Sequence, residues 1–342
     1  MKLIGMLSTN EMLVLAATLL ASALLCFLVT REVVRKLKGK KHFETELGFV
    51  VPDLHKPDKP SIPKLGGIGV AFGIAAGVSV ATAAFAAFGF QVAGDLARLF
   101  AMFTSVIILG LVGLTDDVLR TRYRTRVIAP LLAVIPILAV VPDTTVAVPF
   151  AGVFGLGWLY YVIAAAGFVV LSNAVNMVGG FNGSETGLGS VTVGALLATA
   201  VAFNQLVPSL FLAAALGAFL AFLRFNWFPA RCLPGNMTTH IIGSVFAASA
   251  LVGKMEFMVA VLSLLYVTEF FLKARGGFHV KWWGTLQQDG TLKPSDSRTY
   301  SIHMFFMKHF SLTERGLVAR VVATQAAIAI IVVALTFYGI KP

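Results

Sequence analysis

The chain has 342 residues, of which 58% are hydrophobic and only 13% are Asp, Glu, Lys or Arg, and its formal net charge at pH 7 is +11. A composition this apolar excludes an ordinary water-soluble domain and predicts a chain that crosses a membrane several times. The basic excess favours a lipid bilayer and anionic small molecules as partners, and we expect no nucleic acid partner.

Ten apolar runs are long enough, or nearly so, to cross about 30 Å of hydrocarbon, which takes about 17–25 residues in a helix. The sixth and eighth are the shortest and could be tilted or broken. We expect an all-α polytopic membrane protein with about ten transmembrane helices in a single domain over residues 1–342. The ten runs are 11–30, 65–89, 97–114, 127–142, 157–175, 188–204, 207–225, 238–252, 255–273 and 316–339.

The basic residues are unevenly distributed among the connections. Of the 27 Lys and Arg residues, nine lie between the first two runs, four after the third, two at the end of the seventh or after it, and seven at the end of the ninth or after it. Because basic residues collect in cytoplasmic loops, these connections are predicted to be cytoplasmic and both termini to lie outside. The chain also lacks long outer insertions, which favours a plasma membrane.

The outer connections are short. The stretch "TTVAVPFAGVFGLG" (144–157) alternates apolar residues with Gly and Pro, which predicts a small β-hairpin at the outer surface. The polar motifs all fall in the predicted cytoplasmic connections instead. We therefore expect a functional site built from cytoplasmic loops.

Adjacent carboxylates, Asp116 and Asp117, follow the third run in "GLTDDVLRTRYRTR". Carboxylates at a membrane boundary are costly unless they meet a cation, a proton or a basic partner. One interpretation is a structural pair balanced by the nearby Arg residues. The other is a metal or proton site beside an arginine-rich loop suited to phosphates.

Two further loops are rich in amides and glycine. In "NAVNMVGGFNG", Asn176 and Asn182 could read a base or a sugar or ligate a hard cation, although a Gly-rich turn between helices would look the same. In "FNWFPARCLPGN", Asn236 follows a Pro-Gly turn at the start of a helix, which favours anion binding. Arg231 is either a phosphate ligand or a topological charge.

Taken in order, these motifs resemble those of the polyprenyl-phosphate N-acetylhexosamine-1-phosphate transferases, and within them the archaeal and eukaryotic UDP-GlcNAc:dolichyl-phosphate GlcNAc-1-phosphate transferases (glycosyltransferase family 4). The resemblance runs from "DLHKPDKPSIPKLGG" to "HMFFMKHFSLTERGLVARVV". It implies transfer of a sugar-1-phosphate from a UDP-sugar to a polyprenyl or dolichyl phosphate with release of UMP. It also implies Mg²⁺, with Mn²⁺ as an alternative.

The resemblance also implies residue roles. Asp116 and Asp117 match an acidic pair that orients or deprotonates the lipid phosphate, and Asn176 matches a ligand of Mg²⁺. Asn182 matches a residue that reads the uracil. Basic groups near the phosphates are implied at Lys56 and Arg126.

Two positions depart from the family pattern. Asn236 stands where the family has an Asp that ligates the metal, so a neutral amide replaces a carboxylate. The last cytoplasmic loop has "KARGGFH", in which Lys273, Arg275 and His279 are approximate substitutes for diphosphate contacts. These departures leave open a second hypothesis, a non-catalytic member that binds a UDP-sugar or a lipid phosphate. A transporter is a third, which the absence of an internal repeat disfavours. Whether the protein forms a homodimer is left open.

Overall fold

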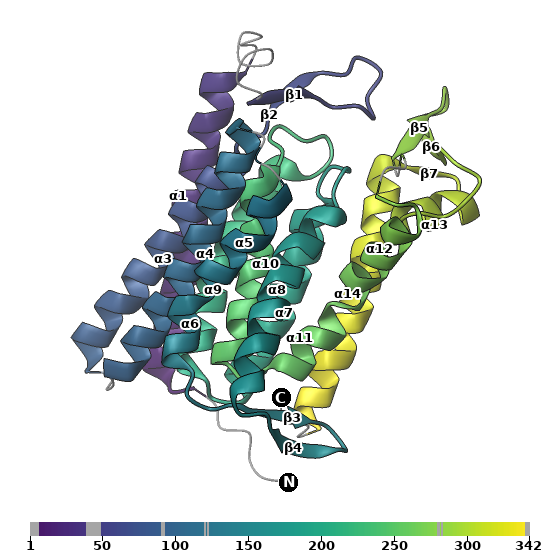
Figure 1. Ribbon diagram of the computed structural model, residues 1–342. Coiled ribbons are helices and arrows are strands. Elements are labelled where there is room, and N and C mark those ends of the chain that lie inside the picture. Colours follow the sequence, from purple (N-terminus) through teal and green to yellow (C-terminus); the bar gives the residue numbers. More distant parts are fainter. Residues whose placement is uncertain are drawn as a thin grey trace.

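The fold is a bundle of helices that run along one common direction, with small antiparallel sheets at both ends (Figure 1). It is seen in a computed structural model, which describes residues 7–38, 49–89, 93–119, 121, 123–278, 281 and 283–338, and the side chains of all of these except 93 and 123–127. The helices are α1 (Thr9–Leu37), α3 (Gly66–Phe88), α4 (Ala93–Leu119), α5 (Tyr123–Ala133), α6 (Ile135–Val140), α7 (Trp158–Met177), α8 (Ser184–Ala202), α9 (Leu206–Asn226), α10 (Gly235–Val252), α11 (Glu256–Leu262), α12 (Leu264–Arg275), α13 (Ile302–His309) and α14 (Glu314–Phe337).

Each of the ten predicted runs overlaps a helix or a pair of consecutive helices. Among the described residues, however, seven helices are long and apolar enough to cross a membrane, or eight if the bent pair α11 and α12 counts as one span. The protein is therefore a mostly helical, multi-pass membrane protein, whereas the full count of ten stays a prediction.

The breaks occur in the fourth and ninth runs, not in the sixth and eighth. In the fourth run, α5 ends at Ala133, α6 begins at Ile135, and Pro136 lies in the first turn of α6. The helix breaks here because proline cannot donate the backbone hydrogen bond that would continue it. In the ninth, α11 and α12 meet at Ser263 with a bend of 54°.

Short strands form three separate sheets. The predicted hairpin is confirmed as β3 (Thr145–Val148) paired with β4 (Gly152–Gly155). At the opposite end of the bundle lie β1 (Val50–Pro52) with β2 (Ser61–Pro63), and the sheet β5 (Gly284–Leu286), β6 (Thr291–Pro294) and β7 (Leu312–Thr313) (Figure 1). The beginning of α1 and the end of α14 lie at the β3–β4 end.

Helix α10 lies at the centre of the bundle and packs against α3, α4, α7 and α8. Of its 18 residues, 16 are buried. Its first two turns carry Asn236, Thr238, Thr239 and His240, so the most buried helix brings polar side chains to one end of the bundle.

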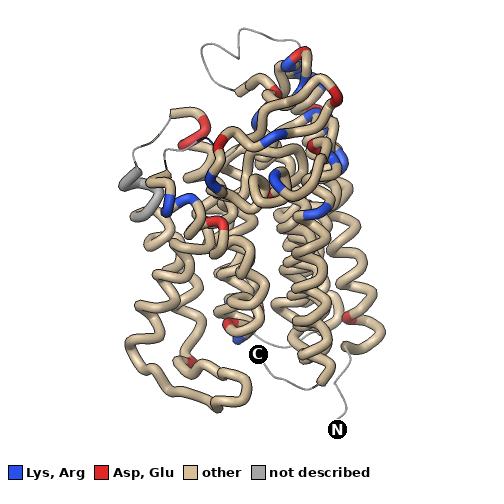
Figure 2. Tube along the Cα trace, turned by 90° about the vertical axis from the view of Figure 1, so that its right-hand side faces the viewer, with Lys and Arg blue, Asp and Glu red and all other residues tan. Residues whose placement is uncertain are grey.

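Positive charge gathers at that same end. Figure 2 shows most of the described Lys and Arg residues around the β1–β2 and β5–β7 sheets and few near the β3–β4 hairpin. A second hydrophobic cluster, which includes Phe181, Met304 and Leu317, packs α13 and the start of α14 against the loop between α7 and α8. This packing brings residues near 303 and 314 to the loop that carries Asn182.

Candidate functional site

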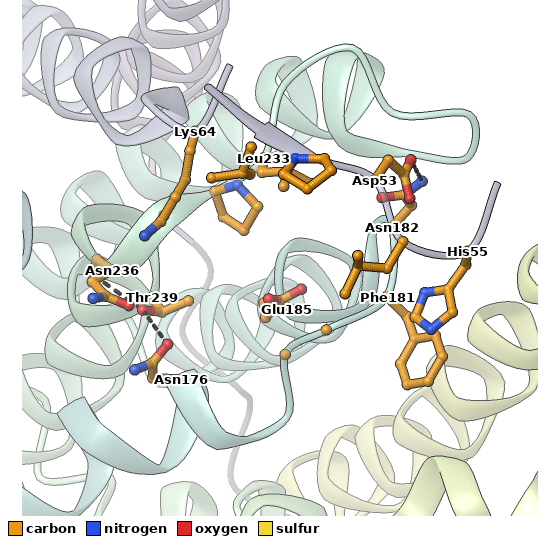
Figure 3. Close-up of a pocket in the computed structure, with 17 residues that line it drawn as sticks. Asp53, His55, Lys64, Asn176, Phe181, Asn182, Glu185, Leu233, Asn236 and Thr239 are labelled. Atoms are coloured by element: carbon orange, nitrogen blue, oxygen red, sulfur yellow. Dashed lines mark hydrogen bonds between the residues drawn. The ribbon is translucent and has the colours of Figure 1, made fainter. Parts of the chain in front are cut away.

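A cleft of about 400 Å³ opens at the basic end of the bundle. Three segments line it: the β1–β2 connection, the loop between α7 and α8, and the turn that begins α10 (Figure 3). These are three of the polar motifs singled out in the sequence, so the fold brings together loops that are far apart in the chain.

One end of the cleft is built on the acidic pair at the end of α4. Asp116 lies directly behind Asn236, whose Nδ2 donates to Asp116 Oδ2 at 2.5 Å. Thr121 Oγ1 donates to the other oxygen, Oδ1, at 2.6 Å. Asp116 is 3% exposed, so this carboxylate reaches the cleft through Asn236.

Asp117 joins α4 to the wall of the cleft and to the start of α10. Its Oδ1 is 2.8 Å from Lys64 Nζ, and its Oδ2 accepts the backbone N–H of Met237 at 3.3 Å. Because α10 has no side-chain cap at Pro234, Asp117 takes the place of a capping residue and its negative charge meets the positive end of the helix dipole.

Glycine is required at the turn that precedes Asn236. Gly235 has φ +65°, and a Cβ there would lie 2.5 Å from Lys64 O and 2.6 Å from Asp117 Oδ2. A side chain at this position would force the acidic pair away from α10. The sequence "PGN" therefore fixes the spacing between Asp117, Lys64 and Asn236.

Asn176 completes this end of the cleft. It lies in the last turn of α7, and Thr239 Oγ1, one turn along α10 from Asn236, donates to Asn176 Oδ1 at 3.4 Å. In Figure 3 the side chains of Asn176, Thr239, Asn236 and Lys64 lie on one side of the cleft. This end offers amide oxygens and one ammonium group, backed by two carboxylates.

Asn182 forms the other end of the cleft. It is 3% exposed; its Nδ2 donates to Asp53 Oδ2 at 2.9 Å, and its backbone N–H donates to Glu314 Oε1 at 2.7 Å. The next residue, Gly183, has φ +86°, and a Cβ there would lie 2.7 Å from the Trp227 ring. Asn182 is thus held by contacts to two distant segments.

Three rings stack beside Asn182. The ring centroids of His55 and Phe181 are 4.7 Å apart, and those of Phe181 and His303 are 4.5 Å apart, with interplanar angles of 10° and 23°. Burial lowers the pKa of His55 to about 4 and that of His303 to about 3, so both rings are neutral at pH 7. The stacked rings give this end of the cleft a flat, uncharged surface, and the Asp53 carboxylate, paired with Lys56, lies beside it.

Asp53, His55 and Glu314 form a buried cluster whose potential ligand atoms all lie within 4.8 Å of one another. Lys56 forms an ion pair with Asp53, and its ammonium group lies 5.0 Å from the centroid of the Phe228 ring. Burial lowers the pKa of Lys56, and the charge of Glu314 opposes this effect. Lys56 and Asn182 donate to these carboxylates, so the Lys56 ammonium group supplies the positive charge that the cluster needs. The cluster joins the β1–β2 connection to the start of α14.

Lys273 belongs to a network behind the cleft. It forms an ion pair with Glu269 at 3.3 Å and donates to the carbonyl of Met177, and Glu269 accepts the backbone N–H of Ile302 at 2.8 Å. Its side chain is 5% exposed and does not line the cleft. Lys273 therefore anchors the end of α7 to α12 and α13.

The structure brings five of the predicted site residues together at the cleft: Asp116, Asp117, Asn176, Asn182 and Asn236. Lys56 is adjacent through Asp53. Arg275 is exposed at the end of α12 and does not line the cleft. Arg126 lies in α5, but its side chain is outside the described part of the chain, and His279 lies outside the described residues altogether.

Arg231 faces a different hollow. A groove of about 630 Å³, lined by apolar side chains such as Leu220 and Trp227, carries Arg224 and Arg231 at its rim. The Arg231 guanidinium donates to the Arg224 carbonyl at 3.1 Å and lies 4.9 Å from the centroid of the Phe225 ring. The structure does not bring Arg231 to the cleft.

Sequence reasoning missed several residues of the site: Asp53, His55, Lys64, Glu185 and Glu314. All five lie in motifs that the sequence analysis quoted or in their direct continuation, and each is a polar side chain in an unusually apolar chain. Lys64, which follows "SIP" and precedes "LGG", gave no clear signal, because a basic residue at a helix entrance can serve either topology or phosphate binding.

Comparisons with known proteins agree on one family. Residues 99–254 match glycosyl transferase family 4. The chain is 30% identical over 331 residues to a protein of Saccharolobus solfataricus, covering 95% of this chain and 98% of the relative. It is 32% identical to a protein of Sulfolobus acidocaldarius, covering 94% and 97%. Both are named UDP-N-acetylglucosamine–dolichyl-phosphate N-acetylglucosaminephosphotransferase. A phospho-N-acetylmuramoyl-pentapeptide-transferase of Shouchella clausii is 29% identical, covering 69% and 73%.

Proposed function

Because the chain belongs to glycosyl transferase family 4, we propose that it transfers N-acetylglucosamine-1-phosphate from its UDP-sugar to a polyprenyl or dolichyl phosphate. UMP is the second product, and the reaction would begin the synthesis of a lipid-linked glycan. The names of the two archaeal relatives support the sugar and the lipid. The name of the bacterial relative supports the same type of transfer.

The observation that carries the proposal is the contrast between the two ends of the cleft. Lys64 and the oxygens of Asn176 and Asn236 line one end, which suits a diphosphate and its cation. Asn182 and the His55–Phe181 stack lie at the other end, which suits a nucleobase. A UDP-sugar has its base and its diphosphate in this arrangement, joined by a ribose, so one molecule would meet both ends.

In the reaction, an oxygen of the lipid phosphate attacks the phosphorus next to the sugar. The bond from that phosphorus to the bridging oxygen breaks, and UMP leaves with the electron pair. The reactants are all anionic, so the protein must orient them and offset their repulsion. We assign the orientation, or the deprotonation, of the lipid phosphate to Asp116 and Asp117, and part of the charge compensation to Lys64.

Further roles are proposed for residues that the resemblance singled out. Asn182 would read the uracil, and Lys56 and Arg126 would lie near the phosphates. Arg275 and His279 would contact the diphosphate from the last loop only if that loop approaches the cleft when substrate is bound. For Arg231 the groove position supports no such contact.

The oxygens at the ionic end fit Mg²⁺, because this cation prefers carboxylate and amide oxygens to nitrogen or sulfur ligands. Asn176 and Asn236 would hold it together with the carboxylates of the acidic pair, and Mn²⁺ would be an alternative. When bound, the cation would neutralise the diphosphate and stabilise the leaving UMP. Asn236 would contribute an amide oxygen while its Nδ2 donates to Asp116.

We further propose ten spans in a single transferase domain over residues 1–342, in a plasma membrane, with the cleft facing the cytoplasm and both termini outside. Two features support this topology: basic residues gather at the cleft end (Figure 2), and α1 begins and α14 ends at the other end (Figure 1). By the positive-inside rule, the basic residues at the cleft end favour a cleft that faces the cytoplasm.

The first prediction is the reaction itself. Purified protein given radiolabelled UDP-N-acetylglucosamine and dolichyl or undecaprenyl phosphate is expected to form lipid-linked sugar and UMP in equal amounts. A chelator should abolish the reaction and added Mg²⁺ should restore it. Binding of UDP-sugar without any transfer would favour a non-catalytic family member. Release of UDP-sugar across a sealed vesicle membrane without chemistry would favour a transporter.

A second prediction concerns Arg231. Because its guanidinium lies at the rim of the groove and not at the cleft, Arg231→Gln is expected to change kcat and the KM for the UDP-sugar by less than about threefold, which is typical of a surface position. Lys64→Gln, made in parallel, should lower turnover much more. An equal, large loss in both variants would show that Arg231 does reach the substrate.

A further inference from the structure

We propose that Asp53 determines which nucleobase the cleft accepts, because it fixes the orientation of the Asn182 side-chain amide. The amide nitrogen of Asn182 donates to Asp53 Oδ2 at 2.9 Å. The amide oxygen accepts no hydrogen bond among the described residues, so it is the acceptor that is left to meet a ligand. The inference rests on the proposed function, since it takes the base of a UDP-sugar as the group that Asn182 meets.

Asp53 can fix the orientation of the Asn182 amide because an ionised carboxylate only accepts hydrogen bonds, whereas a primary amide can either donate or accept. If the Asn182 amide turned over, its oxygen would face the Asp53 carboxylate and two acceptors would oppose each other. Asp53 is 5% exposed, so little water can relieve that contact, and a buried pair of opposed acceptors is strongly unfavourable. The ion pair with Lys56 supplies the opposite charge that an ionised Asp53 needs.

The backbone of Asn182 is held in place independently of Asp53. Its backbone N–H donates to Glu314 Oε1 at 2.7 Å. Gly183, in the left-handed region, lies against Trp227. Because these contacts hold the backbone, the orientation of the side-chain amide depends on its own hydrogen bond, and the partner in that bond is Asp53. Figure 3 shows the Asn182 side chain at the wall of the cleft, next to Asp53.

The consequence is a preference for a base with an N–H group at the position that faces Asn182. Uracil carries a hydrogen on N3 and can donate to the Asn182 oxygen. Cytosine has an unprotonated N3, an acceptor, which would face that oxygen without a hydrogen between them. A site that leaves buried polar groups unpaired rejects the wrong ligand strongly. The cleft is therefore expected to bind UDP in preference to CDP, and to owe this preference to Asp53.

The test compares UDP and CDP affinities by isothermal titration calorimetry in wild type, Asp53→Asn and Asp58→Asn. An asparagine at position 53 can either accept from or donate to the Asn182 amide, so both orientations become compatible. We expect the ratio of CDP to UDP dissociation constants to fall by about tenfold or more in Asp53→Asn. Asp58 is an exposed acid in the same connection, so Asp58→Asn removes the same charge and should keep the wild-type ratio.

The ratio is measured on one preparation of each protein, so a fraction of misfolded molecules does not change it. If Asp53→Asn cannot be purified, Asp53→Ser removes the same carboxylate and carries the same expectation. Wild type that prefers UDP, with both Asp53 variants keeping the full preference, would overturn the inference and leave the proposed function intact. Wild type that binds UDP and CDP equally would also overturn it. Wild type that binds neither nucleotide would overturn the proposed function as well.

Discussion

Asp117→Asn is expected to lower turnover by about 100-fold or more, and Asp116→Asn by a similar factor. Each substitution keeps the shape of the side chain and removes one negative charge from the ionic end of the cleft. Losses of this size are typical when a positioned acid, base or electrostatic group is removed. The measurement is steady-state transfer of labelled sugar to the lipid phosphate.

Asparagine keeps the contact of Asp117 that caps α10, so the expected loss reflects the missing charge and not a lost helix cap. An asparagine oxygen can still accept the Met237 N–H, as Asp117 Oδ2 does at 3.3 Å, whereas the ion pair with Lys64 is lost. Asp95→Asn is the matched control, because Asp95 lies in the first turn of the same helix, at its other end, and pairs only with Arg98 among the ion pairs of the described residues. If the turnover of the Asp116 and Asp117 variants stays within about threefold of that of Asp95→Asn, the acidic pair has a structural role only.

Asn236→Asp is expected to lower the Mg²⁺ concentration needed for half-maximal activity by about tenfold. The substitution adds a full carboxylate charge to a set of oxygen ligands, and hard cations favour carboxylates over amides. The structure adds a second consequence. Asn236 Nδ2 donates to Asp116 Oδ2 at 2.5 Å, and an aspartate at position 236 has no hydrogen to donate there.

Without a cation, the variant would therefore hold two carboxylates against each other. We expect its melting temperature in a chelator to fall below that of wild type, and Mg²⁺ to raise it by more than it raises wild type. Asn204→Asp is the control, since Asn204 is exposed between α8 and α9. If metal dependence and chelator stability both stay at wild-type values, Asn236 and Asp116 do not share a cation. If only the variant is active, the wild-type protein is a non-catalytic member of the family.

Much of the helical framework follows from local pattern. Each apolar run overlaps a helix because a backbone that crosses hydrocarbon must satisfy its hydrogen bonds within the helix. Pro136 was a sequence signal for the break in the fourth run. The sixth and eighth runs were instead expected to be tilted or broken because they are the shortest. α8 is apolar enough to span although it is short, and α10 lies at the centre of the bundle, where most of its residues are buried.

Residues of the candidate site could be predicted where each has a local signal of its own, but not where they are identified only by a partner far away in the chain. Asp116, Asn176 and Asn236 stand out because each is polar next to an apolar run. The partnership of Asp53 with Asn182 and of Asn182 with Glu314 spans more than 120 residues each, and nothing in a local pattern encodes such a pairing. Arg231 had a local signal, but an ambiguous one, because a basic residue at the end of a span looks the same whether it sets the topology or binds a ligand.

The central claim is that a single UDP-sugar lies along the cleft, with its base at Asn182 and its diphosphate at Lys64 and Asn236. An experimental structure of the protein with UDP-N-acetylglucosamine and Mg²⁺ tests it most directly. We expect density for the uracil within hydrogen-bond distance of the Asn182 amide oxygen, and for the diphosphate between Lys64 Nζ and the Asn236 side chain. Density for the nucleotide in the groove beside Arg224 and Arg231, or with its base at the Lys64 end, would contradict it.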